Sequence, residues 1–67
     1  MRADKVEVSW DGGKESWLIR IEVGSEVIRR HCDQPRDSNE GQLRTAALQT
    51  VSDEGYEADP SRVSVIR

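Results

Sequence analysis

The chain has few cysteines and no long apolar run, and each shortage excludes a class of protein. A single cysteine, Cys32, cannot form an internal disulfide, which excludes the small folds that are held together by disulfide bridges. No apolar window approaches the length needed to cross a bilayer, and none follows residues 1–5 to act as a secretion signal. Repeats and low-complexity tracts are also absent. We therefore expect a soluble cytoplasmic protein without membrane association.

Residues that carry out chemistry are equally scarce. The stretch Gly12-Gly13-Lys14 lacks the spacing of a phosphate loop, and a strand follows it rather than a helix. His31 and Cys32 are neighbours in a predicted strand, so they point to opposite faces and the imidazole cannot readily activate the thiol. One Cys and one His make too few zinc ligands unless Asp33, Asp37 or a second subunit contributes. We expect no catalytic residue, no cofactor, no metal and no enzyme activity.

The length and composition predict one small domain that spans residues 1–67. Apolar core formers are limited to seven Val, four Ile and three Leu, with no Phe, and two Trp and Tyr56 add apolar area. A net charge of −3 is compatible with folding. We expect a folded domain of modest stability, which self-association would help.

Alternating apolar residues on both sides of a Gly-Gly pair predict a β-hairpin. If Gly12-Gly13 forms a two-residue turn with positive φ at both positions, Asp11 faces Lys14 and Val8 faces Trp17. Period-two alternation then places one set of side chains on a common inward face. This set comprises Val6, Val8, Trp10, Trp17, Ile19, Ile21 and Val23.

A second turn is predicted at Gly24-Ser25, followed by a third strand over residues 26–32. This turn places Ile21 opposite Ile28 and Trp17 opposite Cys32. Arg30 interrupts the inward side of the third strand, which suggests an edge strand whose long side chain bends its charged group into water.

A helix follows the polar loop that contains Pro35. Asp37 or Ser38 can cap its first turn, with Glu40 as a partner like that of a capping box. Gly55 is placed to form the left-handed C-terminal cap. The inward stripe of the helix comprises Leu43, Ala46, Ala47, Thr50 and Val51, with Leu48 at its margin.

The last apolar segment, residues 62–66, predicts a final strand with Val63 and Val65 inward, and Tyr56 covers the helix end. A right-handed crossover places this strand beside the first. The expected fold is α+β: a two-layer sandwich in the order βββαβ, with one helix packed on a four-stranded mixed sheet of strand order 3-2-1-4.

Two short stretches carry a resemblance to a known family. Ser38-Asn39-Glu40-Gly41-Gln42-Leu43-Arg44 is similar to the start of the first helix of ribonuclease-H-like proteins, and Asp11-Gly12-Gly13 resembles the Asp-Gly of their first strand. The element order resembles the opening half of that fold. Gln42 stands where the family's helix carries a glutamate, and the last strand ends without an acid. Two-metal hydrolysis needs several converging carboxylates, so the resemblance implies a related fold without nuclease activity.

One helix covers only one face of the sheet, so the other face is the candidate functional surface. Leu18 and Val27 are its apolar members, and Arg20 is expected directly opposite Arg29, a like-charge pair that an anion, an acidic side chain or a partner would relieve. The full outward set comprises Glu7, Ser9, Leu18, Arg20, Glu22, Val27, Arg29 and His31. We take Leu18, Arg20, Val27, Arg29 and His31 as the candidate interaction surface.

Two functions fit such a surface. The first is a non-enzymatic protein-interaction module, most simply a homodimer that pairs through this face or through the edge of the third strand. The alternative is binding of single-stranded nucleic acid, with Arg20, Arg29, Arg30 and Arg36 on phosphates. The acidic net charge and the inward tryptophans disfavour the alternative.

Overall fold

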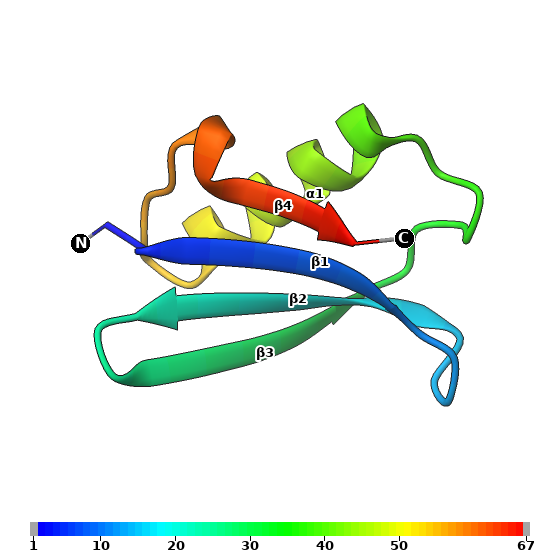
Figure 1. Ribbon diagram of the computed structural model, residues 1–67, viewed down its shortest axis with the longest axis horizontal. Coiled ribbons are helices and arrows are strands. Elements are labelled where there is room, and N and C mark those ends of the chain that lie inside the picture. The colour runs from blue at the N-terminus through cyan, green and yellow to red at the C-terminus, as the bar shows by residue number, and fades with distance from the viewer. Residues whose placement is uncertain (1, 67) are drawn as a thin grey trace.

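Four strands and one α-helix form the described part of the chain, residues 2–66, in the computed structural model (Figure 1). The elements are β1 (Lys5–Asp11), β2 (Ser16–Val23), β3 (Glu26–Cys32), α1 (Glu40–Asp53), a 3-10 turn (Pro60–Arg62) and β4 (Val63–Ile66). The sheet order is β3-β2-β1-β4, with β1 parallel to β4 and the two other pairs antiparallel. The predicted α+β fold with strand order 3-2-1-4 is confirmed.

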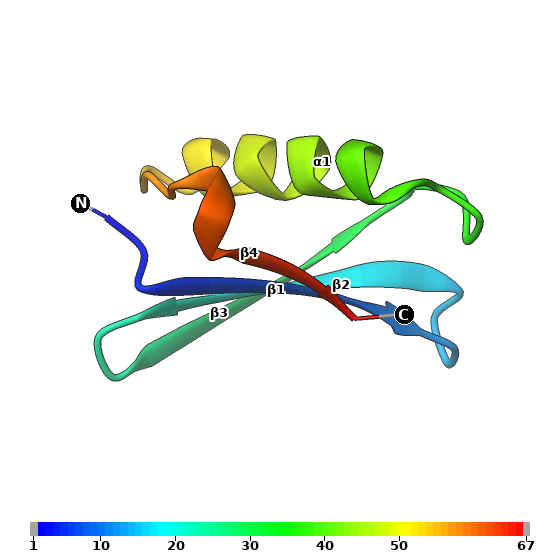
Figure 2. The same cartoon turned by 45° about the horizontal axis from the view of Figure 1, so that its top comes forward.

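The core lies between α1 and one face of the sheet (Figure 2). Leu43, Ala47 and Val51 are the buried residues of α1. This apolar stripe is narrow, and its small side chains allow the helix to pack close to the sheet. Trp17 is 2% exposed, and its Nε1 donates a hydrogen bond to the carbonyl oxygen of Pro35 at 2.9 Å. The buried core residues are Ala3, Val6, Val8, Trp17, Ile19, Ile21, Leu43, Ala47, Val51 and Val63.

The predicted register of the first hairpin is wrong by two residues. Asp11 pairs with Ser16 and Val8 with Ile19, so the loop has four residues, 12–15. The carboxylate of Asp11 accepts a hydrogen bond from the Gly13 N–H, and its carbonyl accepts one from the Lys14 N–H. The chain therefore begins to turn directly after Asp11. Glu15 rather than a glycine takes the positive φ, 50°. Because side chains alternate with period two, a shift of two changes every partner but no face.

The predicted register of the second hairpin is confirmed. Val23 pairs with Glu26 and Ile21 with Ile28. Gly24 has a φ of 60° at the first turn position, where a type II′ turn requires glycine. The Asp4 carboxylate accepts a hydrogen bond from the Gly24 N–H at 2.7 Å, so the N-terminal segment helps to hold this turn.

The N-terminal cap of α1 differs from the prediction. Asn39, not Asp37 or Ser38, is the N-cap, and it forms a reciprocal capping box with Gln42. Asn39 lies one position closer to the helix than Ser38, so its side chain reaches the backbone N–H of Gln42, the third residue of the helix. The other end agrees with the prediction, because Gly55 has a φ of 86°.

The C-terminal segment agrees with the prediction except at its start. Tyr56 is partly buried against the core beyond the end of α1. Arg62 ends the 3-10 turn, and the strand begins at Val63. The strand begins one residue later than predicted because Asp59 caps the 3-10 turn, where its carboxylate accepts hydrogen bonds from the N–H and the hydroxyl of Ser61.

Candidate interaction surface

The sheet presents a face opposite α1 that no described element covers (Figure 2). The pairing registers arrange the outward side chains of this face in rows across the strands. One row holds Ser64, Glu7, Arg20 and Arg29, the next holds Ile66, Ser9, Leu18 and His31, and a third holds Lys5, Glu22 and Val27. The registers therefore bring Leu18, Arg20, Val27, Arg29 and His31 together on one face, as predicted.

Arg20 lies between an acid and a second arginine. The registers place it opposite Arg29 on β3 and opposite Glu7 on β1. With the two-residue turn expected from the sequence, Lys5 would have stood in the position of Glu7. The observed register thus supplies Arg20 with a neighbouring carboxylate. Its Nε is buried without a hydrogen-bond partner among residues 2–66, so the guanidinium keeps unused donor capacity.

Glu7 is held in its charged form by two cations. The Lys5 ammonium lies 2.9 Å from the Glu7 carboxylate, and this hydrogen bond lowers the pKa of Glu7, with a further contribution from the charge of Arg20. The same contact raises the pKa of Lys5. Arg29 lies on β3, on the far side of β2 from Glu7, and so remains at the outside of the row.

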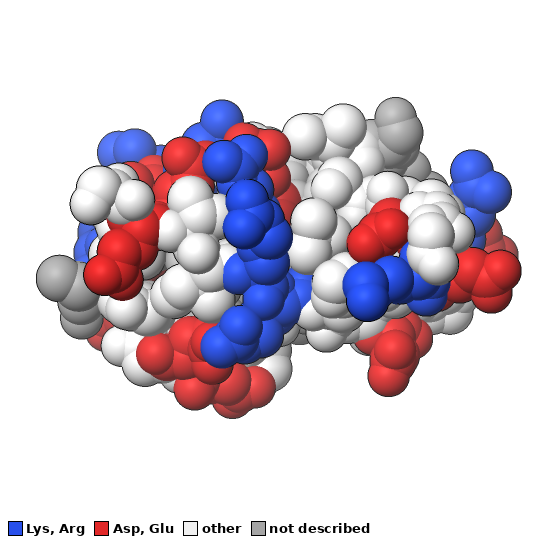
Figure 3. Space-filling model, turned by 90° about the horizontal axis from the view of Figure 1, so that it is seen from below, with Lys and Arg blue, Asp and Glu red and all other residues white. Residues whose placement is uncertain are grey.

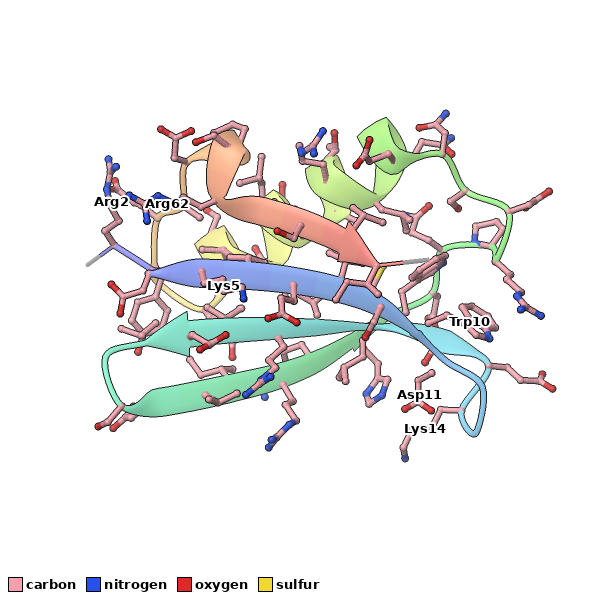
Figure 4. All side chains as sticks on the ribbon, in the orientation of Figure 1. Arg2, Lys5, Trp10, Asp11, Lys14 and Arg62 are labelled. Carbon is pink, nitrogen blue, oxygen red and sulfur yellow. The ribbon has the colours of Figure 1, made fainter. Side chains whose placement is uncertain are left out.

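His31 forms a hydrogen bond with Asp11 at the hairpin end of the face, a contact that was not predicted from the sequence. Its Nε2 lies 3.1 Å from the Asp11 Oδ2. The hydrogen bond to His31 lowers the pKa of Asp11, and the backbone N–H groups of Gly13 and Lys14 lower it further. Figure 4 shows Asp11 and Lys14 together at the first hairpin, and Lys5 at the other end of β1. The registers place His31 in the row of Ser9 rather than that of Asp11, so this contact crosses the sheet diagonally and strand pairing alone does not predict it.

The apolar members of the surface lie apart from one another. Leu18 is half-buried at the centre of the face, whereas Val27 is 37% exposed on β3 and Ile66 is 51% exposed on β4. Ile66 was not among the residues predicted for this surface, since only the inward Val63 and Val65 of the last strand were assigned a face. Its outward position follows from the same alternation.

The edge formed by β3 carries a basic feature. A band of Lys and Arg side chains crosses the view onto this edge, between groups of Asp and Glu (Figure 3). β3 contributes Arg29 on the outer face and Arg30 on the side of α1. Arg30 forms an ion pair with Glu54 at the end of α1, and its Nη1 donates to the Arg29 carbonyl at 2.8 Å. The Arg30 side chain is 54% exposed, as predicted for a long side chain on an edge strand, and it is also held by these two contacts.

The tryptophans lie on the helix side of the sheet, as predicted. Trp10 packs edge-to-face on Trp17, with ring centroids 5.3 Å apart. The Arg36 guanidinium lies over the Trp10 ring, 5.6 Å from its centroid. Neither ring contributes to the candidate surface.

The two residues considered for nucleophilic chemistry, His31 and Cys32, lie on opposite faces of the sheet. His31 lies on the outer face, and the half-buried Cys32 lies on the helix side. No cluster of three or more His, Cys, Asp or Glu side chains suited to a metal ion occurs in this range. An open groove of about 490 Å³ beside α1 is lined by uncharged side chains, Gln34, Gln42, Thr45, Ala46 and Gln49. Within the same range, no helix combines the length and apolar character needed to cross a bilayer.

The uncovered face and the β3 edge are thus the features from which function can be inferred. Comparison with protein-family models, with curated proteins and with solved structures found no match for this chain. The inference therefore depends on the chemistry of the surface itself.

Proposed function

We propose that this protein is a small non-enzymatic interaction module that binds a protein partner through the outer face of its sheet and the adjoining edge of β3. The observation that carries the proposal is the one-sided sandwich: α1 packs on one face, and the other face joins an exposed edge strand. That face presents Leu18 and Val27 beside Arg20 and Arg29.

Protein partners suit this combination of groups. Arginine is enriched in protein interfaces because its flat guanidinium forms several hydrogen bonds and also packs against apolar groups. Arg20 is half-buried at the centre of the face, and the exposed Val27 offers apolar contact beside Arg29. An exposed strand edge adds backbone donors and acceptors with which an extended segment can pair.

Single-stranded nucleic acid is less well supported by the geometry. Of the four arginines considered for phosphate contacts, only Arg20 and Arg29 lie on the outer face. Arg30 is engaged by Glu54, and Arg36 lies over Trp10 on the other side of the sheet. Bases on the outer face would also lack an aromatic platform, which contributes much of the affinity for single strands.

Site-directed photo-crosslinking tests the proposal. A photo-reactive amino acid replaces Val27 on the proposed surface or, as the control, the exposed Gln49 on the outside of α1. In the cells that express the protein natively, we expect protein adducts from position 27 and few from position 49. Adding Arg29→Glu should reduce the adducts at position 27 severalfold. Equal yields at both positions, or adducts of nucleic acid, would contradict the proposal.

A further inference from the structure

The free edge of β3 has a defined set of backbone groups. Val23 and Glu26 close the two-residue turn between β2 and β3. The closing pair of such a turn exchanges both hydrogen bonds, and the bonding direction then alternates along the strand. The N–H and C=O groups of Val27, Arg29 and His31 therefore face away from β2. The bond from the Arg30 Nη1 to the Arg29 carbonyl agrees with this assignment, since that carbonyl is open to approach from outside.

Charges along β3 are arranged antisymmetrically about Ile28. Glu26 stands two residues before Ile28 and Arg30 two residues after it, and all three point to the side of α1. Two copies of this strand that pair antiparallel about a two-fold axis at Ile28 place Glu26 opposite the partner's Arg30. Each pair occurs twice by symmetry. On the outer face, Val27 then lies opposite the partner's Arg29.

Other symmetric registers lack this complementarity. An axis at Arg29 places that residue against the partner's Arg29, and an axis at Arg30 places two more like charges together, which is unfavourable in a cross-strand pair. An axis at Val27 places Glu26 opposite the partner's Ile28 and forms no ion pair. Charge complementarity therefore selects the register centred on Ile28.

We propose that the partner of this surface is a second copy of the chain, joined through antiparallel pairing of β3 about Ile28. The inference rests on the proposed function and states which protein pairs with the edge of β3. Two four-stranded sheets join into one continuous sheet, and Ile28, half-buried at the rim of the core, meets its symmetry mate. Arg30 exchanges the Arg29 carbonyl for Glu26 of the partner subunit. The partner's Val27 N–H then bonds the freed carbonyl.

Charge reversal on one side of the pair tests the register. In sedimentation velocity over a concentration series, we expect the wild-type chain to dimerise, and Glu26→Arg to raise the dimer Kd by about tenfold or more because both ion pairs become repulsive. Arg30→Glu should do the same. An equimolar mixture of the two variants should form heterodimers with a Kd close to that of the wild-type dimer, because every pair is again of opposite charge.

Controls separate pairing from folding. Glu57→Arg makes the same charge change outside β3 and should dimerise like the wild-type chain. Arg30→Glu also loses the contact with Glu54, so circular dichroism of each variant checks its fold. Glu26 is exposed, so Glu26→Arg alone keeps the test decisive if Arg30→Glu fails to fold.

Two outcomes would overturn the inference: a wild-type monomer at every concentration up to the millimolar range, or dimerisation of Glu26→Arg at the wild-type Kd. A monomeric wild-type chain whose position 27 still crosslinks to a different protein would overturn the homodimer and leave the proposed function standing. If position 27 gives no adduct at all, both the homodimer and the proposed function are contradicted.

Discussion

At the scale of single residues, the loop between β1 and β2 places conformational strain on Glu15. Its φ of 50° lies in the left-handed region, which costs an L-residue with a Cβ roughly 1–2 kcal/mol. Gly12 and Gly13, three and two positions earlier, are not in that conformation. The hydrogen bonds to Asp11 fix where the turn starts, and the left-handed residue of the loop therefore falls at Glu15.

Relief of this strain should stabilise the protein. We expect Glu15→Asn to raise the free energy of unfolding by roughly 0.5–1 kcal/mol, because asparagine tolerates the left-handed region. Glu15→Gly should gain less, because glycine adds conformational entropy to the unfolded chain. Urea unfolding measures both. Lys14→Asn, whose position has no positive φ, is the control, and equal stabilisation by it would contradict the explanation.

The Asp11–His31 pair gives stability a pH dependence of known sign. The folded state lowers the pKa of Asp11, so its contribution is fully present above the pKa of an unfolded aspartate, about 3.9. It is lost as the pH falls through the lower folded value. Asp11→Asn should therefore be less stable than the wild-type chain near neutral pH, and the difference should shrink in acid.

Urea unfolding of both proteins across an acidic pH series measures this difference. In parallel, NMR titration of the Asp11 carboxyl carbon should show its pKa rising in His31→Gln, since the hydrogen bond to His31 is the largest cause of the shift. A difference in stability that grows as the pH falls would show that the assigned sign is wrong.

At the scale of the elements, α1 depends on its first turn. The Asn39 side chain accepts a hydrogen bond from the Gln42 N–H at 2.8 Å, and the Gln42 side chain accepts one from the Asn39 N–H at 3.1 Å. With no basic residue in its last turn, α1 lacks the usual charge compensation at its C-terminal end. The N-terminal cap and the left-handed Gly55 therefore define the limits of the helix.

Replacement of the observed cap should cost more than replacement of the one expected from the sequence. We predict that Asn39→Ala lowers the free energy of unfolding by about 1 kcal/mol, and that Asn39→Ser retains most of it. Asp37→Ala, two residues earlier, should change it by less than about 0.5 kcal/mol. Thermal and urea unfolding of the three variants decide between the two caps, and a larger loss from Asp37→Ala would favour the cap that the structure rejects.

At the scale of the whole molecule, a single core joins the sheet to α1. Trp17 is buried in it, and Trp10 packs on Trp17 from the hairpin end. The helix contributes Leu43, Ala47 and Val51 to the same cluster, so neither layer can bury its apolar surface without the other. The fluorescence of the tryptophans therefore reports on the packing of the entire domain.

Unfolding should accordingly be one cooperative transition. We expect the urea midpoint from tryptophan fluorescence to coincide with that from far-ultraviolet circular dichroism, because sheet and helix lose their shared core together. Glu26→Arg, which removes the proposed dimer contacts, is the matched variant in which the midpoint should no longer depend on protein concentration. A helix signal that persists after the fluorescence transition would contradict a single core.

Most of the fold could be predicted because local chemistry fixes it. The apolar alternation from Val6 to Val23 assigns the faces of β1 and β2, and Gly24 at a positive φ fixes the second hairpin. The pairing of Arg20 with Arg29 followed from that turn. The first hairpin could not be predicted in detail, because a glycine pair fits several loop lengths and Asp11 selects among them through its own hydrogen bonds.

The sequence by itself determined which side chains share a face, because the period of a strand or a helix is a local property. Only the tertiary structure decided which charges meet across distant segments. It placed Glu7 beside Arg20, Asp11 beside His31, and Glu54 against Arg30. These contacts depend on register and on how α1 crosses the sheet, and the free energy that sets both comes from packing of the shared core rather than from any one stretch of residues.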